Sequence, residues 1–469
     1  MNTTSERIEI DEVDFQISCR RFTIRATITR DRQLPVVDEF VLRLLSVLDQ
    51  MPVAKMRAWF GFTESEMQTV LVDMGRRSLV ELTGDDLRLA PAGRELFRSV
   101  SRDGVPHIVE VAPLLESVWF DLVSRNMVPR SRARPTDYLV KVAEQPSARE
   151  MPEAFAMAAF EENFRDYARR IRRFPDPDAV NLYSISDVEG GVYGYQVLRA
   201  KLVLDLDRMK VRPIFSDLTD SPANYQTLTV AANDAWQLVS GPDSTATTAA
   251  EFERMTGNAR FTPVINEPDN AEAWLEVFQL LATPIPGFKL TAGASYLGFN
   301  LEPVLTAISD LKPSDDVCEI IWLRPSGSTW GRTQRVAEAL VSIGDALRNA
   351  GRTNVGTVLA MPRSTSKATR TNHKRLFARG VLLPQGHLPA NLEVLIVAGV
   401  VAVVNVHLPV GGHSVPIGSV VSDARRLSRI LERLTSGNGD GWEELWRAMP
   451  AKPSDEDDSN ESYRTLDTI

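Results

Sequence analysis

The stretch from Pro35 to Val100 most constrains how this chain can fold, because helix, turn and strand signals follow one another there without a gap. Apolar residues recur at helical spacing from Val37 to Leu48, so a first helix should bury one face. A short second helix is predicted to begin after Pro52 and to end at Gly61, since glycine favours the left-handed position that follows a helix.

A third helix, a hairpin and a fourth helix complete the same stretch. Thr63, followed three residues later by Glu66, has the pattern of a capping box and marks the start of the third helix. Residues 79–82 alternate like a strand, residues 83–86 form a turn, and residues 87–89 return as a second strand. Pro91 then suits the first position of a closing helix.

This order of elements resembles the winged-helix family over residues 35–102. The resemblance implies a third helix in the major groove of duplex DNA and a wing on the DNA backbone. The side chains assigned to that contact are Gln68, Thr69, Arg76, Arg77 and Arg88. Glu64, Glu66 and Asp73 on the same helix would repel phosphate, so a winged helix that docks a partner protein stays open as the alternative.

The distribution of charge and the cysteine content indicate which part of the chain could meet DNA and where the protein is expected to be located. The net charge is −9, yet residues 20–102 hold 14 Lys and Arg against 11 Asp and Glu, and residues 125–173 hold 11 against 7. Positive charge is therefore biased towards the part expected to meet DNA. Cys19 and Cys318 suggest neither a disulfide framework nor a zinc site, which fits a cytoplasmic location. No apolar run approaches the roughly 20 residues of a membrane span, and no signal peptide is expected.

Composition shifts predict an α/β multidomain chain with six sequential parts. Residues 178–312 include an expected turn at Glu189–Gly191 between two strands. The six parts are an N-terminal β arm (1–34), the winged helix (35–102), a helical connector (103–177), a mixed α/β region (178–312), a C-terminal α/β domain (313–447) and a disordered acidic tail (448–469).

The C-terminal α/β sandwich resembles one half of a phospholipase D-type fold. The resemblance rests on the apolar pattern of LPANLEVLIVAGVVAVVNVHLP, followed by IGSVVSDARRLSRILERL. It places Asn391 where that family has its nucleophilic histidine, Glu393 where it has a lysine, and Ala398 where it has an aspartate. Asparagine is not a comparable nucleophile, and Glu393 adds negative charge where a phosphate would lie, so the resemblance implies a catalytically dead domain. A second half would come from residues 178–300 or from a second chain.

These patterns predict a DNA-binding protein that is not an enzyme and needs neither a cofactor nor a metal. It would bind double-stranded DNA as a transcription regulator or sensor, alone or as a homodimer, without a membrane. The alternative is an accessory subunit of a bacterial antiviral (anti-phage) defence complex with partner protein subunits. A nuclease or phosphodiesterase ranks third, since it would require His373, His387 or His413 to gather with Lys374 in one pocket.

Overall fold

The computed structural model describes residues 7–97, 107–129, 135–215, 222–239, 248–282, 289–435 and 441–448. The chain divides into two compact units, and neither is one continuous segment. Unit 1 consists of Met1–Ile17, Ala133–Ala143 and Tyr195–Ile469, and unit 2 of Ser18–Arg132 and Glu144–Gly194. Three of the six expected parts, residues 1–34, 103–177 and 178–312, each contribute residues to both units. The acidic tail, apart from Ala448, lies outside the described residues.

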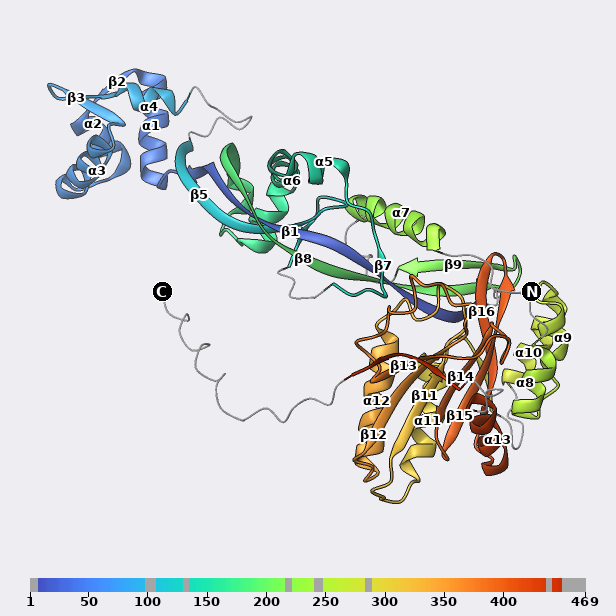
Figure 1. Cartoon of the computed structure of the whole chain (residues 1–469). Helices are drawn as coiled ribbons and strands as arrows, with labels where there is room; N and C mark the ends of the chain where they lie inside the picture. The colour runs from blue at the N-terminus through green and yellow to red at the C-terminus, as the bar shows by residue number, and fades with distance from the viewer. Residues whose placement is uncertain are drawn as a thin grey trace. The chain divides into compact units, whose positions relative to one another are not determined.

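Two long strands, β1 (Arg7–Gln33) and β8 (Val180–Asp205), each contribute residues to both units (Figure 1). The expected N-terminal arm is thus a strand inside a sheet, between β5 and β8. The turn expected at Glu189–Gly191 was wrong, since β8 runs through it. A Cβ added at Gly190 would lie 2.4 Å from Nη2 of Arg20, so this glycine makes room for a neighbouring side chain and does not reverse the chain.

Unit 2 contains a module of residues 34–97, called the N-terminal module below, in which three strands pair in the order β2-β4-β3. Its elements are α1 (Val36–Leu48), β2 (Gln50–Pro52), α2 (Val53–Phe60), α3 (Glu64–Arg76), β3 (Val80–Thr83), β4 (Asp86–Leu89) and α4 (Pro91–Glu95). The expected helices and hairpin are confirmed in their expected order, and Gly61 ends α2 in the left-handed conformation with φ 68°. Strand β2 was not foreseen.

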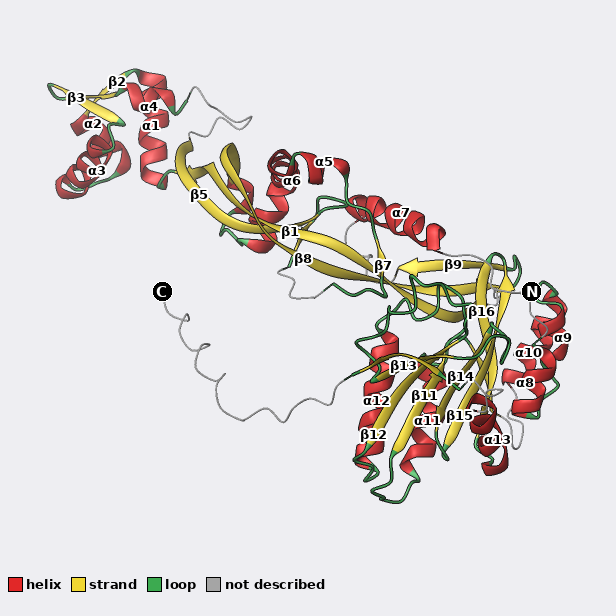
Figure 2. Ribbon diagram, in the orientation of Figure 1, coloured by secondary structure: helices red, strands yellow, loops and turns green. Residues whose placement is uncertain are grey.

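The rest of unit 2 is a sheet with helices on one side (Figure 2). Its further elements are β5 (His107–Asp121), β6 (Met127–Val128), α5 (Pro146–Glu150), α6 (Pro152–Asp166), a π-helical turn (Tyr167–Ile171) and a 3₁₀ turn (Pro177–Ala179). The helical connector expected over 103–177 is wrong for its first part, since β5 pairs antiparallel with β1 from Asp121 to His107. Apolar side chains of α6, such as Phe155 and Phe160, cover Phe22 and Ile24 of β1.

Unit 1 is built on a mixed sheet in the order β10-β16-β15-β14-β11-β12-β13-β17. Strands β11, β12 and β13 run parallel, and the remaining neighbours are antiparallel. The bounds are β10 (Lys289–Ala292), β11 (Cys318–Leu323), β12 (Val355–Met361), β13 (Arg379–Leu382), β14 (Leu392–Val397), β15 (Val401–Val410), β16 (His413–Val421) and β17 (Glu443–Arg447). Short strands β7 (Val140–Lys141) and β9 (Lys210–Phe215) pair with β1 and β8.

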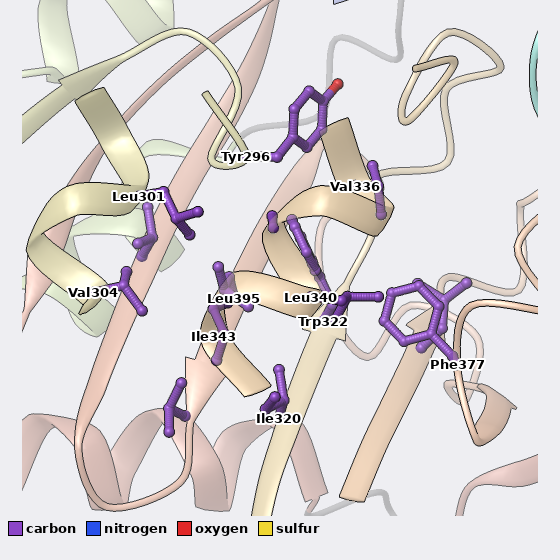
Figure 3. Close-up of a cluster of buried hydrophobic side chains, with 14 of the residues drawn as sticks. Tyr296, Leu301, Val304, Ile320, Trp322, Val336, Leu340, Ile343, Phe377 and Leu395 are labelled. Atoms are coloured by element: carbon purple, nitrogen blue, oxygen red, sulfur yellow. The ribbon is translucent and has the colours of Figure 1, made fainter. Parts of the chain in front are cut away.

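The described residues of unit 1 also form seven helices, of which α11 and α12 share the core of this sheet. The seven helices are α7 (Pro222–Val239), α8 (Ala249–Thr256), α9 (Thr262–Asn266), α10 (Ala271–Ala282), α11 (Gly298–Ser309), α12 (Arg335–Asn349) and α13 (Ala424–Thr435). Leu301 of α11 and Ile343 of α12 pack with Ile320, Trp322 and Leu395 of the central strands (Figure 3). Helix α8 lies against β15 and β16 and contacts α13. In the described part of the chain, none of the helices has the length and apolar character needed to cross a bilayer.

Candidate functional site

Helix α3 of the N-terminal module begins where its capping box places it. The Thr63 hydroxyl accepts from the Glu66 N–H at 3.3 Å, and the Glu66 carboxylate accepts from the Thr63 N–H at 2.8 Å. The Thr63 hydroxyl also donates to the Glu66 carboxylate at 2.8 Å, and the two bonds donated by the Thr63 N–H and hydroxyl lower the pKa of Glu66. Glu66 is therefore committed to the helix start, and the capping box predicted from the sequence is confirmed.

The side of α3 that faces away from the core carries a mostly polar surface. Met67 and Met74 are buried and fix the orientation of the helix against α1 and the hairpin. Because residues three and four apart share one helix face, the opposite side brings six side chains together. They line one recess and are Ser65, Gln68, Thr69, Val72, Asp73 and Arg76.

Two of the five residues assigned to DNA contact are open on this face. Gln68 and Arg76 are exposed, and within the described residues neither makes a hydrogen bond or an ion pair. Thr69 is exposed too, but its hydroxyl donates to the Ser65 carbonyl at 2.9 Å. An amide and a guanidinium about two helical turns apart on one face can read a base edge and hold a phosphate, respectively.

The other two assigned residues hold the module together. Arg77 forms ion pairs with Asp38 of α1, whose side chain is 7% exposed, and with Asp73 at 2.6 Å. Arg88 on β4 donates to the side-chain oxygen of Gln50 on β2. Both side chains are half-buried, and each joins two elements of the module.

A second candidate site lies in unit 1 around Glu393, which is fully buried on β14. Its carboxylate accepts hydrogen bonds from Ser295 Oγ, from Trp322 Nε1 at 3.0 Å, from Trp330 Nε1 at 3.1 Å and from His407 Nε2 at 2.8 Å. Burial alone would raise the pKa of Glu393, but these hydrogen bonds and the nearby His407 together lower it. The carboxylate is thus held charged with donors on both oxygens.

His407 extends this buried network towards the surface. Its Nε2 donates to Glu393, so in the neutral ring Nδ1 is the acceptor, and the Ser414 hydroxyl donates to it at 2.9 Å. Asn391 accepts from the Thr248 hydroxyl at 2.6 Å and donates to the His407 carbonyl at 3.2 Å. Ala398 follows the other end of β14, about 20 Å from Asn391 at the usual rise per residue of a strand.

The histidines considered as substitutes are dispersed. His373 is buried beside the Gly331 carbonyl and stacks on Tyr138, while His387 bonds the Arg433 carbonyl at 2.7 Å. His413 stacks on Trp236. In the part of the chain that the structure describes, no three His, Cys, Asp or Glu side chains converge as metal ligands.

Sequence reasoning missed the partners of Glu393. They come from positions 63 to 98 residues away for Ser295, Trp322 and Trp330. One signal was present, since a lone carboxylate inside the apolar strand Leu392–Val397 requires buried donors somewhere in the fold. Spacing along the chain cannot identify which donors they are.

Comparison with known proteins adds little to this geometry. No protein-family model matches the chain, and no curated protein matches it in sequence. Among solved structures, one that is similar belongs to TrmBL2, an archaeal chromatin protein described as showing a novel mode of DNA binding. The match has a TM-score of 0.20 and 12% identity, and it covers 48% of this chain and 69% of that chain. A TM-score this low establishes no shared fold.

Proposed function

We propose that this protein is a non-catalytic DNA-binding regulator or sensor whose N-terminal module acts as a winged helix. The observation that carries the proposal is the open face of α3, where Gln68 and Arg76 have no partner within the described residues while the helix is firmly capped. The hairpin β3–β4 would serve as the wing. Arg77 and Arg88 would then support the module, and Arg76 would be the main phosphate contact.

The region 313–447 is, in this proposal, a degenerate phospholipase D-like domain with a sensing or assembly role in the cytoplasm. A buried Asn391 bonded to Thr248, and a Glu393 carboxylate saturated by donors, leave no nucleophile of the kind that such chemistry needs. Hydrolysis of phosphodiesters is therefore not expected.

An exposed apolar stripe on α1 favours a second function, in which the module docks a protein subunit, as in an antiviral defence complex. Val36, Phe40 and Val47 are 68%, 52% and 79% exposed and recur at helical spacing on one side of α1. Exposed apolar patches of this kind mark protein contacts more often than DNA contacts.

A gel-shift series across salt concentrations tests the first function. Arg76→Ala should weaken binding to all duplexes alike and reduce the slope of log K against log salt by about 0.9, the value for one lost phosphate contact. Gln68→Ala should instead relax sequence preference by about 1–3 kcal/mol. The matched control is Arg348→Ala, which removes an exposed arginine from α12 and should change neither quantity.

Two further outcomes of the same series separate the alternatives. Flat salt dependence with no shift below about 10 μM, far above the usual range for specific sites, would contradict DNA binding. Retention of a partner protein by the parent chain but not by a Phe40→Ser variant would then favour docking. Incubation of the same mixtures with divalent metals should leave the DNA intact, and cleavage would overturn the non-catalytic part of the proposal.

A further inference from the structure

Helices α8 and α13 of unit 1 enclose a small recess in the surface. Its volume is about 240 Å³. The side chains that line it are Glu251, Arg254, Met255, Arg429, Glu432 and Arg433. Three arginines and two glutamates therefore surround the recess, so its lining carries a net positive charge. Met255 is 3% exposed and supplies an apolar contact.

One buried carboxylate positions two of the three arginines. Glu251, whose side chain is 9% exposed, accepts from Arg433 Nε at 3.0 Å and also forms an ion pair with Arg254. Arg433 Nη2 donates in addition to the His387 carbonyl at 2.7 Å. Because two guanidinium groups share one carboxylate, one positive charge beside the recess is not neutralised by this cluster. The shared bonds also hold both groups in fixed places, which lowers the cost of ordering them around a ligand.

The third arginine is free to engage a ligand. Arg429 lies one turn before Arg433 on α13 and is exposed. Its Nε donates at 3.4 Å to the Arg425 carbonyl of its own helix, and it has no carboxylate partner within the described residues. A guanidinium fork matches the paired oxygens of a carboxylate or phosphate, where a lysine would act only as a point charge.

We propose that this recess binds a small oxyanion, with Arg429 as the group that closes on it. The volume is several times that of one water, about 30 Å³, yet below the roughly 300–1,000 Å³ of sites for drug-sized ligands. Phosphate, pyrophosphate and small di- or tricarboxylates share the required size and charge. The recess belongs to unit 1 and the α3 face to unit 2, and this inference does not depend on DNA binding.

Isothermal titration of the full chain in the absence of DNA tests the site, with inorganic phosphate, pyrophosphate and citrate as probes. Chloride is used to keep ionic strength constant, since exposed charges are screened by salt. Arg429→Gln should weaken binding of the preferred probe at least tenfold, and Arg429→Lys should weaken it less. Glu432→Gln should strengthen binding, because it removes an exposed negative charge from the lining. Arg348→Gln on α12 should leave affinity unchanged.

The variants that test the recess should leave the fold of the protein unchanged. Arg429 and Glu432 take no part in the Glu251 cluster that joins α8 to α13, so both variants should fold, and thermal unfolding checks this directly. Absence of heat with all three probes at millimolar concentration would overturn the proposal. An equal loss of affinity in Arg429→Gln and Arg348→Gln would also overturn it, because that result would indicate diffuse attraction to a cationic surface.

Discussion

Asp11 and His373 are buried groups of unit 1 whose titrations oppose each other. Burial raises the pKa of Asp11 from 3.8 to about 7, although the Tyr296 hydroxyl and the Glu12 N–H partly offset this. Burial, aided by the charge of Arg324, lowers the pKa of His373 from 6.5 to about 3. Asp11 therefore contributes stability that is fully present below pH 4 and is lost as the pH rises through 7. His373 contributes stability that is fully present above pH 6.5 and is lost as the pH falls towards 3.

Asp11→Asn should isolate the first of these two effects. The amide keeps an oxygen for Tyr296 and Glu12 but cannot ionise. The difference in unfolding free energy between variant and parent should therefore grow from pH 5 to pH 8 in favour of the variant by about 3 kcal/mol, because about two of the roughly three pH units between the two pKa values fall within that window. Urea unfolding at several pH values measures this difference. A difference that stays constant over the range would show that Asp11 does not titrate as its burial requires.

At the scale of the single element, the sequence predicted helix ends that depend on neighbouring residues. It did not predict which distant parts of the chain pair with each other. The start of α3 and the end of α2 could be read from Thr63, Glu66 and Gly61, since those bonds join residues within a few positions. Strand β5 was not predicted, because residues 111–120 are mostly apolar on both faces and its partner β1 lies about 90 residues earlier. The hydrogen-bond donors to Glu393 were not predicted either, because they also lie far from it along the chain. Sequence thus predicted the outline of the N-terminal module, but not the buried network of unit 1.

Arg77 ties α1 to α3, and its loss should loosen both helices. In Arg77→Ala the carboxylate of Asp38 stays nearly buried without its partner, at an expected cost of about 1–3 kcal/mol. Arg76→Ala, one position earlier on the exposed face, should cost less than about 0.5 kcal/mol. Hydrogen exchange across residues 34–97 measures the two variants side by side. Equal protection in both would mean that the Asp38 ion pair contributes nothing to the module.

At the scale of the whole molecule, the first strand, β1, is hydrogen-bonded to the start of helix α12, which lies late in the chain. Asp14 is fully buried and accepts from Arg199 Nε at 2.9 Å, from the Thr333 hydroxyl at 3.1 Å and from the Gln334 N–H at 2.7 Å. Glu12 beside it accepts from Arg335 Nε at 2.7 Å. These bonds hold the beginning of β1 against the N-terminus of α12, where the helix dipole also favours a carboxylate.

Asp14→Ala should therefore destabilise unit 1. The variant breaks a buried charged cluster, because the Thr333 hydroxyl and the Gln334 N–H lose this acceptor, while Arg199 keeps Glu12 at 3.4 Å and Glu338 at 3.3 Å. The expected cost is about 3 kcal/mol. Asp345→Ala, which removes an exposed acid from α12, is the matched control and should be close to neutral. Calorimetry that gave the same unfolding temperature for both variants would contradict this account of β1.

The hydrogen bonds between Asp14 and the start of α12 can form only late in synthesis of the chain. Asp14 emerges 320 residues before Gln334, its backbone partner. At about 5–20 residues per second, roughly 16–64 s separate the two on the ribosome. Unit 2 is complete once Gly194 has emerged, whereas unit 1 must wait for its last strands. During that interval Asp14 can gain Arg199, which emerges 185 residues after it, but not its partners at the start of α12. The first residues of β1 therefore lack part of their native contacts until α12 has been synthesised.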